Sequence, residues 1–372
     1  MNKYYQQTDE TIMTFVPFRQ NKTDLFNYDI LRNIFIVTGC IITALFTYSM
    51  TNSSSVKSLS LDIKYADLDD TFIVNLFEEF KVKYNRKYET TDEEKLRYVY
   101  FRDFLRVIDE RNGNDTFAVH GITKFSDFSS EEFTRVSLGY KPNMNTITNA
   151  INIQLNKYSG NESFINWADV YTTAVKDQGY CGSCWAFSAT EQIESDAIRL
   201  GLLTTSDALS PEQIVQCDTV DDGCDGGNTE TAFEYVKKAG GLETDEVYPY
   251  TSYYDVTGSC VSNSADYVVT VDDYYSLSDE DSMIMHIFST GPISVCLDAS
   301  SWSSYVSGII TTCGIDVDHC VQAVGINMDD GYWIVRNSWG TEWGNEGYIW
   351  LASGYNTCNI AYDPNYVEVS GV

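Results

Sequence analysis

Apolar and polar residues recur with different periods in successive stretches of the chain. Residues 72–112 are highly charged, and positions three or four residues apart, among them Phe101 and Ile108, lie on one helical face. A second helix is predicted for residues 184–200, where apolar positions recur at helical spacing up to Gly201. Both patterns predict helices that pack one face against a core.

The composition changes after Gly291 to short strand-like runs separated by Gly and Asp turns. These runs are residues 292–297, 320–326, 332–337 and 348–352. The C-terminal part is therefore predicted to be mostly β and the part that begins at residue 184 mostly helical. Such an α+β arrangement leaves a cleft between two halves, where binding sites commonly form.

Two stretches follow neither period. Residues 136–160 are rich in Asn, Thr, Ser and Lys, which indicates a linker. Residues 34–50 are an uncharged apolar run of 17, at the lower limit for crossing a bilayer.

The charges around the apolar run predict its orientation. Basic residues precede it at Lys3, Arg19, Lys22 and Arg32, whereas only Lys57 follows closely. The excess of positive charge predicts a cytosolic tail at 1–33, a type II signal-anchor at 34–50 and a linker at 51–71. A late signal peptide and a buried core helix are the alternatives.

The net charge of -30 is distributed unevenly. Residues 1–160 hold 19 Lys and Arg against 21 Asp and Glu, whereas residues 161–372 hold 5 against 33. This balance excludes a nucleic-acid partner held by phosphate contacts. A surface so rich in carboxylates suits an acidic compartment, with solubility alone as the simpler interpretation.

Candidate chemistry begins with Cys184, a thiol at the start of an apolar helix. A helix N-terminus and a nearby imidazolium favour the reactive thiolate. The chain has three histidines, His120, His286 and His319. Only His319 is followed by an Asn-Ser-Trp-Gly stretch, beginning at Asn337, that could orient and shield an imidazole.

The stretch Cys181-Gly-Ser-Cys184-Trp resembles the signature of the papain and cathepsin L family of cysteine proteases. His319 follows Cys184 by 135 residues and Asn337 by 153, in the order that the family shows. The resemblance implies a two-subdomain papain-like fold with a helical and a β-barrel-like half. It also implies that Cys184 is the nucleophile, His319 its partner and Asn337 the group that orients the imidazole, with an oxyanion donor at Gln178.

An inhibitory propeptide is implied by two further motifs. Residues Glu93, Arg97, Phe101, Ile108 and Asn112 resemble the family's Glu-Arg-Phe-Asn-Ile-Asn helix, with Phe104 at the first Asn position. Gly121, Phe125 and Asp127 match a second motif, with Thr123 in place of Asn, and Phe80 stands where Trp is usual. We expect a propeptide domain at 72–135, an activation linker at 136–160 and a peptidase domain at 161–372. A lone amphipathic helical hairpin is the alternative.

The ten cysteines favour the secretory route. The resemblance implies the disulfides Cys181–Cys224, Cys217–Cys260 and Cys313–Cys358. Cys296 and Cys320 are expected to lie close together, either bridged or as two free thiols beside the substrate pocket, and we favour the free thiols. The pair Cys181 and Cys184 also spells C-x-x-C, which leaves a redox protein as an alternative to the protease.

The residues that the resemblance assigns to substrate binding are Gly226, Gly227, Thr229, Cys296, Val317, Cys320, Trp339 and Asp363. The glycines would bond the substrate backbone, and the carboxylate of Asp363 would accept a basic side chain at P2, the second residue before the cleaved bond. We therefore expect an endopeptidase that takes Leu, Phe or Arg at P2, working as a monomer on peptides or proteins. A non-catalytic protein that kept the scaffold is the competing class.

No zinc-ligand cluster or phosphate-binding glycine loop occurs in the sequence, so no metal or cofactor is expected. The resemblance implies a lysosomal, endosomal, vacuolar or secreted mature enzyme, and Asn-x-Ser/Thr sequons at Asn21, Asn52, Asn114 and Asn161 allow a glycoprotein. The charge imbalance predicts electrostatic attraction between the propeptide and the peptidase domain, weakened by acid.

Overall fold

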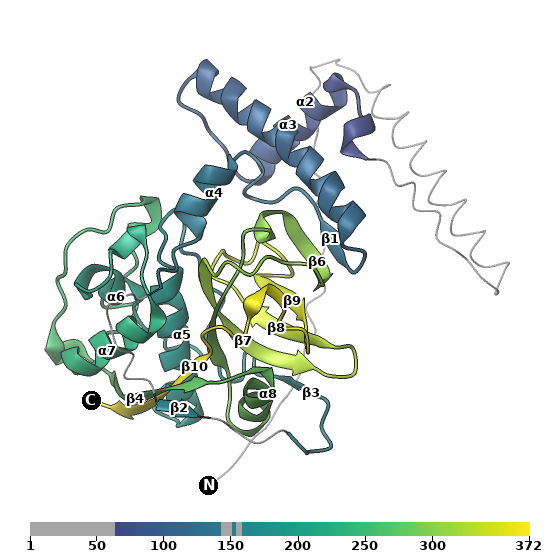
Figure 1. Ribbon diagram of the computed structural model, residues 1–372. Coiled ribbons are helices and arrows are strands. Elements are labelled where there is room, and N and C mark those ends of the chain that lie inside the picture. Colours follow the sequence, from purple (N-terminus) through teal and green to yellow (C-terminus); the bar gives the residue numbers. More distant parts are fainter. Residues whose placement is uncertain (1–63, 143–150, 154–157) are drawn as a thin grey trace, which may run out of the picture. The chain divides into compact units, whose positions relative to one another are not determined.

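The computed structural model describes residues 64–142, 151–153 and 158–372 of the chain (Figure 1). No helix within these ranges is long and apolar enough to cross a membrane. The predicted tail at 1–33 and anchor at 34–50 lie outside the described residues.

The first described elements are two long helices, α2 (Asp70–Lys83) and α3 (Thr91–Asn114), preceded by the single turn η1 (Tyr65–Asp67). The side chains of Asp69 and Thr90 each accept a backbone N–H from the first turn of the helix that follows. These N-caps define where the two helices begin, because the first N–H groups of a helix have no partner within it.

The two helices pack through an aromatic core. The Phe101 ring lies 5.3 Å from the Phe77 ring and 5.2 Å from the Phe80 ring, measured between centroids. Phe80 and Phe104, the two helical positions that depart from the family pattern, are both buried in this core. The departures therefore retain large apolar side chains where the helices meet.

A short strand and a helix lead from this pair towards the rest of the molecule. Strand β1 (Ala118–His120) pairs antiparallel with β6 (Tyr305–Ile310), and helix α4 (Ser130–Ser137) begins with a capping box between Ser129 and Glu132. The N-terminal segment thus joins the edge of the main sheet (Figure 1).

The helical half contains α5 (Cys184–Arg199), α6 (Pro211–Cys217) and α7 (Thr229–Ala239). Its single-turn helices are η2 (Gly223–Asp225), η3 (Ser252–Tyr254) and η4 (Ser264–Asp266). Helix α5 ends one residue before the predicted end, and its side chains are buried from Cys184 to Ala197. Such complete burial means that both halves of the molecule cover this helix.

The β half is built on one sheet whose ten strands follow the order β1-β6-β9-β8-β7-β5-β10-β4-β2, with β3 paired to β7, among the described residues. The strands after β1 are β2 (Ile151–Ile153), β3 (Phe164–Asn166), β4 (Val269–Leu277), β5 (Ile293–Leu297), β6 (Tyr305–Ile310), β7 (His319–Asn327), β8 (Tyr332–Arg336), β9 (Tyr348–Ala352) and β10 (Asn365–Gly371). Helix α8 (Glu280–Ser289) and the turns η5 (Trp302–Ser304) and η6 (Thr357–Asn359) complete it.

The α+β prediction with a helical half and a β half is confirmed, and the four predicted strand runs correspond to β5, β7, β8 and β9. The structure adds one element that the sequence pattern did not indicate, because the short strand β2 lies inside the stretch 136–160. Its three residues pair in parallel with β4. Backbone pairing at a sheet edge needs no long alternating pattern, so a strand this short leaves no period in the sequence.

The two halves are joined by polar contacts between α5 and β7. Ser188 donates its hydroxyl to the Val321 carbonyl at 2.7 Å, and the Gln322 side-chain amide donates to the Ser195 hydroxyl at 3.0 Å. Because buried polar groups require well-placed partners, these bonds fix how α5 sits on the sheet. In this arrangement the first residue of α5 lies close to the first residues of β7.

Candidate active site

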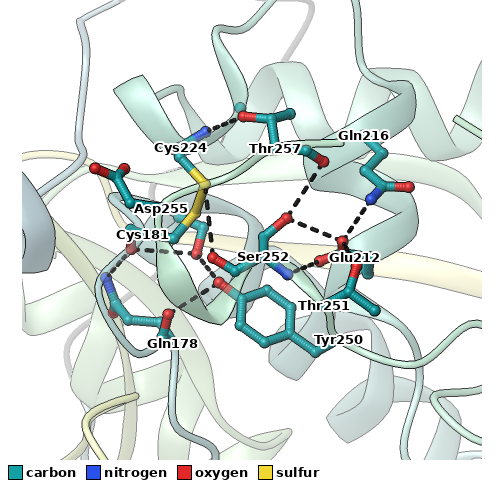
Figure 2. Close-up of a disulfide and its surroundings, with 12 residues drawn as sticks. Gln178, Cys181, Glu212, Gln216, Cys224, Tyr250, Thr251, Ser252, Asp255 and Thr257 are labelled. Atoms are coloured by element: carbon teal, nitrogen blue, oxygen red, sulfur yellow. Dashed lines mark hydrogen bonds between the residues drawn. A yellow bond between two sulfur atoms is a disulfide. The ribbon is translucent and has the colours of Figure 1, made fainter. Parts of the chain in front are cut away.

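The loop that leads into α5 is fixed to the helical half. Cys181 forms a disulfide with Cys224, and Tyr250 donates its hydroxyl to the Gln178 carbonyl at 2.9 Å (Figure 2). The backbone N–H of Gly182 donates to the Cys224 carbonyl at 2.9 Å. Since Cys181 is bonded to Cys224, a Cys181–Cys184 redox pair is excluded in this form of the protein.

Cys184 is the first residue of α5, and its side chain is fully buried. The backbone N–H groups of Cys320, on β7, and Gly139, in the N-terminal segment, act on its sulfur and lower the pKa of the thiol. Burial raises the pKa of the Cys184 thiol to about 12, and these N–H groups only partly offset this rise. In this form of the protein, therefore, burial favours the neutral thiol of Cys184.

His319 is the first residue of β7 and is also fully buried. Its Nε2–H donates to Oδ1 of Asn337 at 2.8 Å, and the ring of Trp339 lies 4.9 Å from the imidazole. The other ring nitrogen, Nδ1, has no hydrogen-bond partner among the described residues. Burial lowers the pKa of His319 to about 4, against the smaller effect of Asn337, which raises it.

The thiolate of Cys184, which a helix N-terminus and a nearby imidazolium would favour, is therefore opposed by burial in this form of the protein. Both groups are cut off from water, and burial disfavours the charged form of each. The sequence shows which two groups are present, whereas their protonation depends on the chain segments that cover them.

Gln178, the expected oxyanion donor, is held on both sides of its amide. Ser338 donates its hydroxyl to Oε1 at 2.7 Å, while Nε2 donates to the carbonyls of Cys181 at 2.9 Å and Ser137 at 3.2 Å. Ser137 is the last residue of α4, in the N-terminal segment. A carbonyl of that segment thus occupies the donor proposed for an oxyanion.

The residues after α4 run through the cleft beside Cys184. Gly227 donates its N–H to the Gly139 carbonyl, and Lys141 donates its N–H to the Gly227 carbonyl, both at 2.8 Å. Tyr140 donates its N–H to the Asp318 carbonyl at 3.0 Å and forms a parallel bridge with Gly227. Asp318 and Gly227 come from opposite halves, so this segment spans the cleft.

Glycines allow the backbone of the N-terminal segment to lie close to the backbone of the helical half. A Cβ atom at Gly139 would lie 1.9 Å from the Gly182 carbonyl oxygen, and one at Gly226 would lie 2.7 Å from the Gly139 oxygen. Gly227 has no space either, because its Cβ would lie 2.6 Å from the Trp185 ring. The backbone contacts therefore depend on the missing side chains.

Several residues expected to bind a P2 side chain belong to the apolar cluster against which Tyr140 packs, or contact that cluster. The Tyr140 ring lies 6.3 Å from the Tyr362 ring and packs against the apolar cluster that contains Cys184, Cys296 and Cys320. Val317 packs against the same cluster. The Oγ1 atom of Thr229 lies 3.8 Å from the Cys296 sulfur.

The preference for two free thiols beside this pocket is wrong. Cys296 and Cys320 form a disulfide, with their Cα atoms 4.0 Å apart. They are direct partners across β5 and β7, a pairing that brings their side chains within bonding reach. The sequence placed each on a strand, but only the register of the two strands puts them opposite each other.

Two carboxyl groups lie near the Tyr140 side chain. Asn365 donates its amide to Asp363 at 2.8 Å, and Ser276 lies within hydrogen-bond distance of both Asn365 and Glu230. Burial raises the pKa of Asp363, and burial together with the charge of Asp363 raises the pKa of Glu230 to about 7. Glu230 had not been predicted from the sequence, since a carboxylate in the first turn of a helix is more often a stabilising charge.

Trp339 covers the imidazole and also receives the N-terminal segment. The rings of Phe125 and Phe133 lie 5.0 Å and 5.4 Å from the Trp339 ring, in edge-on arrangements. Trp339 is buried by these contacts rather than open to a substrate. Its expected place among the substrate-binding residues becomes possible only when the segment leaves.

Among the described residues, three ion pairs link the N-terminal segment to the rest of the molecule, and in each the N-terminal segment supplies the cation. Its cations Lys124, Arg135 and Lys141 pair with Asp177, Asp255 and Asp222 respectively. The uneven charge of the sequence thus appears as direct contacts across the interface. Pairs with exposed members contribute only about 0–1 kcal/mol each, so shape and burial carry most of the attachment.

The remaining disulfides are Cys217–Cys260 and Cys313–Cys358, the pairs that the resemblance implied, and Cys184 is the free cysteine of the described residues. Sequence reasoning missed the cleft-filling role of Gly139 and Tyr140, because they lie in a stretch with no periodic pattern. The orienting role of Ser338 was also missed, although it lies inside the Asn-Ser-Trp-Gly stretch.

Comparison with known proteins agrees with this geometry. Residues 162–368 match the papain family cysteine protease, and residues 77–133 match the cathepsin propeptide inhibitor domain (I29). Among curated proteins, the chain is 35% identical to the probable cysteine protease RDL2 of Arabidopsis thaliana, over 88% of this chain and 93% of that protein. It is 38% identical to cysteine proteinase B of Leishmania mexicana, over 78% of this chain and 68% of that protein.

Solved structures show the same similarity. The digestive procathepsin L2 proteinase from the larval midgut of Tenebrio molitor superposes with a TM-score of 0.73 at 30% identity, covering 80% of this chain and 99% of that one. Recombinant stem bromelain precursor gives a TM-score of 0.67 at 31% identity, covering 79% and 98%. With its cleft filled by its own N-terminal segment, this chain belongs to the papain family of cysteine proteases and carries that family's inhibitory propeptide.

Proposed function

We propose that, once the propeptide is removed, Cys184 attacks peptide bonds and His319 acts as its general base and acid. The observation that carries this proposal is the hydrogen bond from Nε2 of His319 to Asn337. It leaves Nδ1 as the ring nitrogen available to take the Cys184 proton, and Nδ1 has no partner among the described residues.

The proposed reaction follows from these positions. The Cys184 proton passes to Nδ1 of His319, and the thiolate attacks the peptide carbonyl carbon. Gln178 Nε2–H and the Cys184 backbone N–H stabilise the oxyanion, and donors of this kind are worth about 3–4 kcal/mol each. The imidazolium then protonates the leaving amine, and a water molecule hydrolyses the thioester to release the acid and restore the thiol.

Inhibition by the propeptide has two parts in this proposal. The segment that contains Gly139 and Tyr140 blocks the cleft, and its carbonyl at Ser137 occupies the Gln178 amide. The same segment excludes water, so burial holds Cys184 and His319 in their neutral forms. Removing it restores solvent, and the N-terminus of α5 and the imidazole can then favour the thiolate.

We infer a P2 preference from what fills the pocket in the proenzyme. The aromatic ring of Tyr140 packs on an apolar cluster, which favours Leu, Phe or Tyr side chains. The carboxyl groups of Asp363 and Glu230 lie close enough to raise the pKa of the Tyr140 phenol, after the larger effect of burial. They therefore favour a basic P2 side chain such as Arg as well.

Acid activation is proposed to involve His120, a buried residue of β1 in the propeptide. Its Nδ1 lies 3.0 Å from the hydroxyl of Ser304, which also accepts a hydrogen bond from Arg111 at 2.7 Å. Burial lowers the pKa of His120 to about 4; the positive charge of Arg111 adds to this effect, and the carboxylate of Asp115 opposes it. Arg111, on α3, and Asp115 are the charged groups that act on His120.

The sign of this effect favours release in acid. His120 has a lowered pKa in the closed proenzyme, whereas a released propeptide returns it to about 6.5. The closed state therefore has its full stability above pH 6.5 and loses stability as the pH falls towards 4. Asp127 has the opposite sign, because burial raises its pKa and protonation then favours the closed state.

The remaining proposals concern the cellular form of the enzyme. We infer a type II signal-anchor at 34–50 from the excess of basic residues before it, with the peptidase domain on the lumenal side. We propose that the mature enzyme is a monomer. Its strongly acidic peptidase domain fits a lysosomal, endosomal or vacuolar compartment, or secretion. The domain limits 72–135, 136–160 and 161–372 are part of the same proposal.

The first prediction tests the nucleophile. Iodoacetamide should label Cys184 once per mature molecule and abolish peptide hydrolysis, whereas the intact proenzyme should react orders of magnitude more slowly. The physical reason is the raised pKa of the buried thiol, which leaves almost no thiolate near pH 7. Peptide mapping gives the labelled residue, and Cys184→Ala is the inactive control. Equal labelling rates for the two forms would contradict the proposed inhibition.

The second prediction concerns the closest contact in the cleft. Gly139→Ala should displace the propeptide segment, because its Cβ would meet the Gly182 carbonyl at 1.9 Å. We expect the uncleaved variant to react with iodoacetamide at Cys184 at least about tenfold faster than the wild type, since water regains access. Gly113→Ala is the matched control, because no atom outside the neighbouring backbone of its own helix lies within 4 Å of its Cβ. Unchanged labelling in Gly139→Ala would show that the segment does not seal the site.

The third prediction concerns pH. His120→Gln keeps a hydrogen-bonding side chain but removes the titrating group, so the variant should stay latent at pH 7.5 and activate more slowly at pH 5. Each pH unit between about 6 and 4.5 is expected to contribute up to about tenfold to the difference. Rates of processing across this range provide the measurement. Parallel pH profiles for variant and wild type would remove His120 from the proposal.

The fourth prediction concerns the P2 pocket. Asp363→Ala should lower kcat/KM for an Arg-P2 substrate by about tenfold or more at pH 7, because a buried cation would lose its charged partner. Hydrolysis of a Leu-P2 substrate serves as the internal control and should change much less. Equal Arg-P2 turnover by the variant and the wild type would refute the proposed role of Asp363.

A further inference from the structure

The disulfide between Cys296 and Cys320 lies in an unusual place. Its two strands, β5 and β7, are already paired directly at these residues and at the positions on either side, Leu297 with His319 and Val295 with Val321. In the folded state the bond therefore makes no contact between strands that the backbone pairing lacks, although it constrains the unfolded chain over a separation of 24 residues. None of the three bridges implied by the family resemblance includes these cysteines.

Both cysteines belong to the apolar cluster that contains Cys184 and against which Tyr140 packs, where we propose the P2 pocket. Cys320 directly follows His319 in the chain, and its backbone N–H acts on the Cys184 sulfur, lowering the pKa of that thiol. The Cys296 sulfur lies 3.8 Å from Oγ1 of Thr229, on the first turn of α7. The bridge thus forms the part of the pocket wall that connects the β half to the helical half.

Access to this bridge depends on the propeptide. Cys296 and Cys320 are fully buried in the proenzyme, and Tyr140 is packed against the cluster to which both belong. When Tyr140 leaves with the propeptide, the wall faces an open pocket. A disulfide is reduced only when a thiolate can reach one of its sulfurs, so maturation makes this bridge reducible.

Reduction changes the shape of the wall because the backbone cannot follow. Bonded sulfurs are about 2.05 Å apart, whereas two thiols in van der Waals contact need roughly 3.5–4 Å. The neighbouring ladder pairs hold the two Cα atoms at 4.0 Å, so the sulfurs must separate by turning their side chains. At least one thiol then projects into the space that Tyr140 occupies in the proenzyme.

We propose that the Cys296–Cys320 disulfide is a redox-sensitive wall of the P2 pocket, which admits large aromatic side chains when bridged and favours smaller ones when reduced. The co-reactant is a dithiol. One of its thiolates attacks a bridge sulfur and forms a mixed disulfide, and its second thiol closes the dithiol's own disulfide. Two electrons and two protons pass to the protein, and Cys296 and Cys320 become thiols. This proposal rests on the proposed protease function.

The test compares P2 selectivity in the bridged and reduced states. Mature enzyme is kept active in a low concentration of a monothiol or exposed to dithiothreitol, and active sites are counted in each sample. The ratio of kcat/KM for Phe-P2 to that for Val-P2 substrates should fall by about three- to tenfold in dithiothreitol, comparable to the loss of space for a methylene or two. Alkylation and peptide mapping should find Cys296 and Cys320 free only in that sample.

The double variant Cys296→Val/Cys320→Ala is the matched control. Its pocket wall is apolar and has no bridge, so its Phe-to-Val ratio of kcat/KM should be the same in both reductants. Because this variant keeps the other three disulfides, it also shows whether their reduction changes the ratio. A second control is the intact proenzyme. Alkylation after exposure to dithiothreitol should leave its Cys296 and Cys320 unlabelled, because the bridge stays intact.

Several results would overturn the proposal. These are a bridge that resists dithiothreitol in the mature enzyme, a reduced bridge with an unchanged ratio, a double variant that responds like the wild type, or equal labelling of the two cysteines in the proenzyme. Failure of the proposed protease function is distinct, because hydrolysis would then be absent or would survive labelling of Cys184.

Discussion

The burial of Cys184 and His319 under the propeptide is the constraint on which the rest of this proenzyme depends. Two groups that form a reactive pair in water are held neutral when the segment around Gly139 excludes solvent. Burial therefore controls the charge of the site as well as access to it. Because the propeptide supplies both effects with the same few residues, removing that segment opens the cleft and restores the conditions for a thiolate together.

The attachment of the propeptide combines weak and strong contributions. The ion pairs from Lys124, Arg135 and Lys141 all place the positive charge on the propeptide, but the pairs of Arg135 and Lys141 have exposed members, which limits what those two contribute. Aromatic packing on Trp339 and the backbone pairing with Gly227 are buried and specific. The charges thus favour the encounter of the two parts, whereas the buried contacts fix the register.

The site also depends on the joint between the two halves. Helix α5 carries Cys184 and β7 carries His319, and buried polar bonds such as that of Ser188 to β7 hold the two elements together. An apolar joint would tolerate sliding, whereas a joint of directional hydrogen bonds has one satisfied arrangement. The disulfide Cys296–Cys320 lies beside this joint, where we propose that it forms a wall of the P2 pocket. Changes at this wall therefore affect the substrate side chain more directly than the position of the nucleophile.

The sequence by itself determined the elements and the order of the chemistry. Periodic apolar residues identified α3, α5 and four strands, and the spacing of Cys184, His319 and Asn337 identified the family, because these signals lie within short stretches of chain. The tertiary structure alone decided three things: that Tyr140 packs on the cluster that contains Cys184, that Cys296 faces Cys320, and that burial favours the neutral thiol of Cys184. Each depends on strand register or on exclusion of water by segments far apart in the sequence, and neither leaves a local pattern that can be read from the residues.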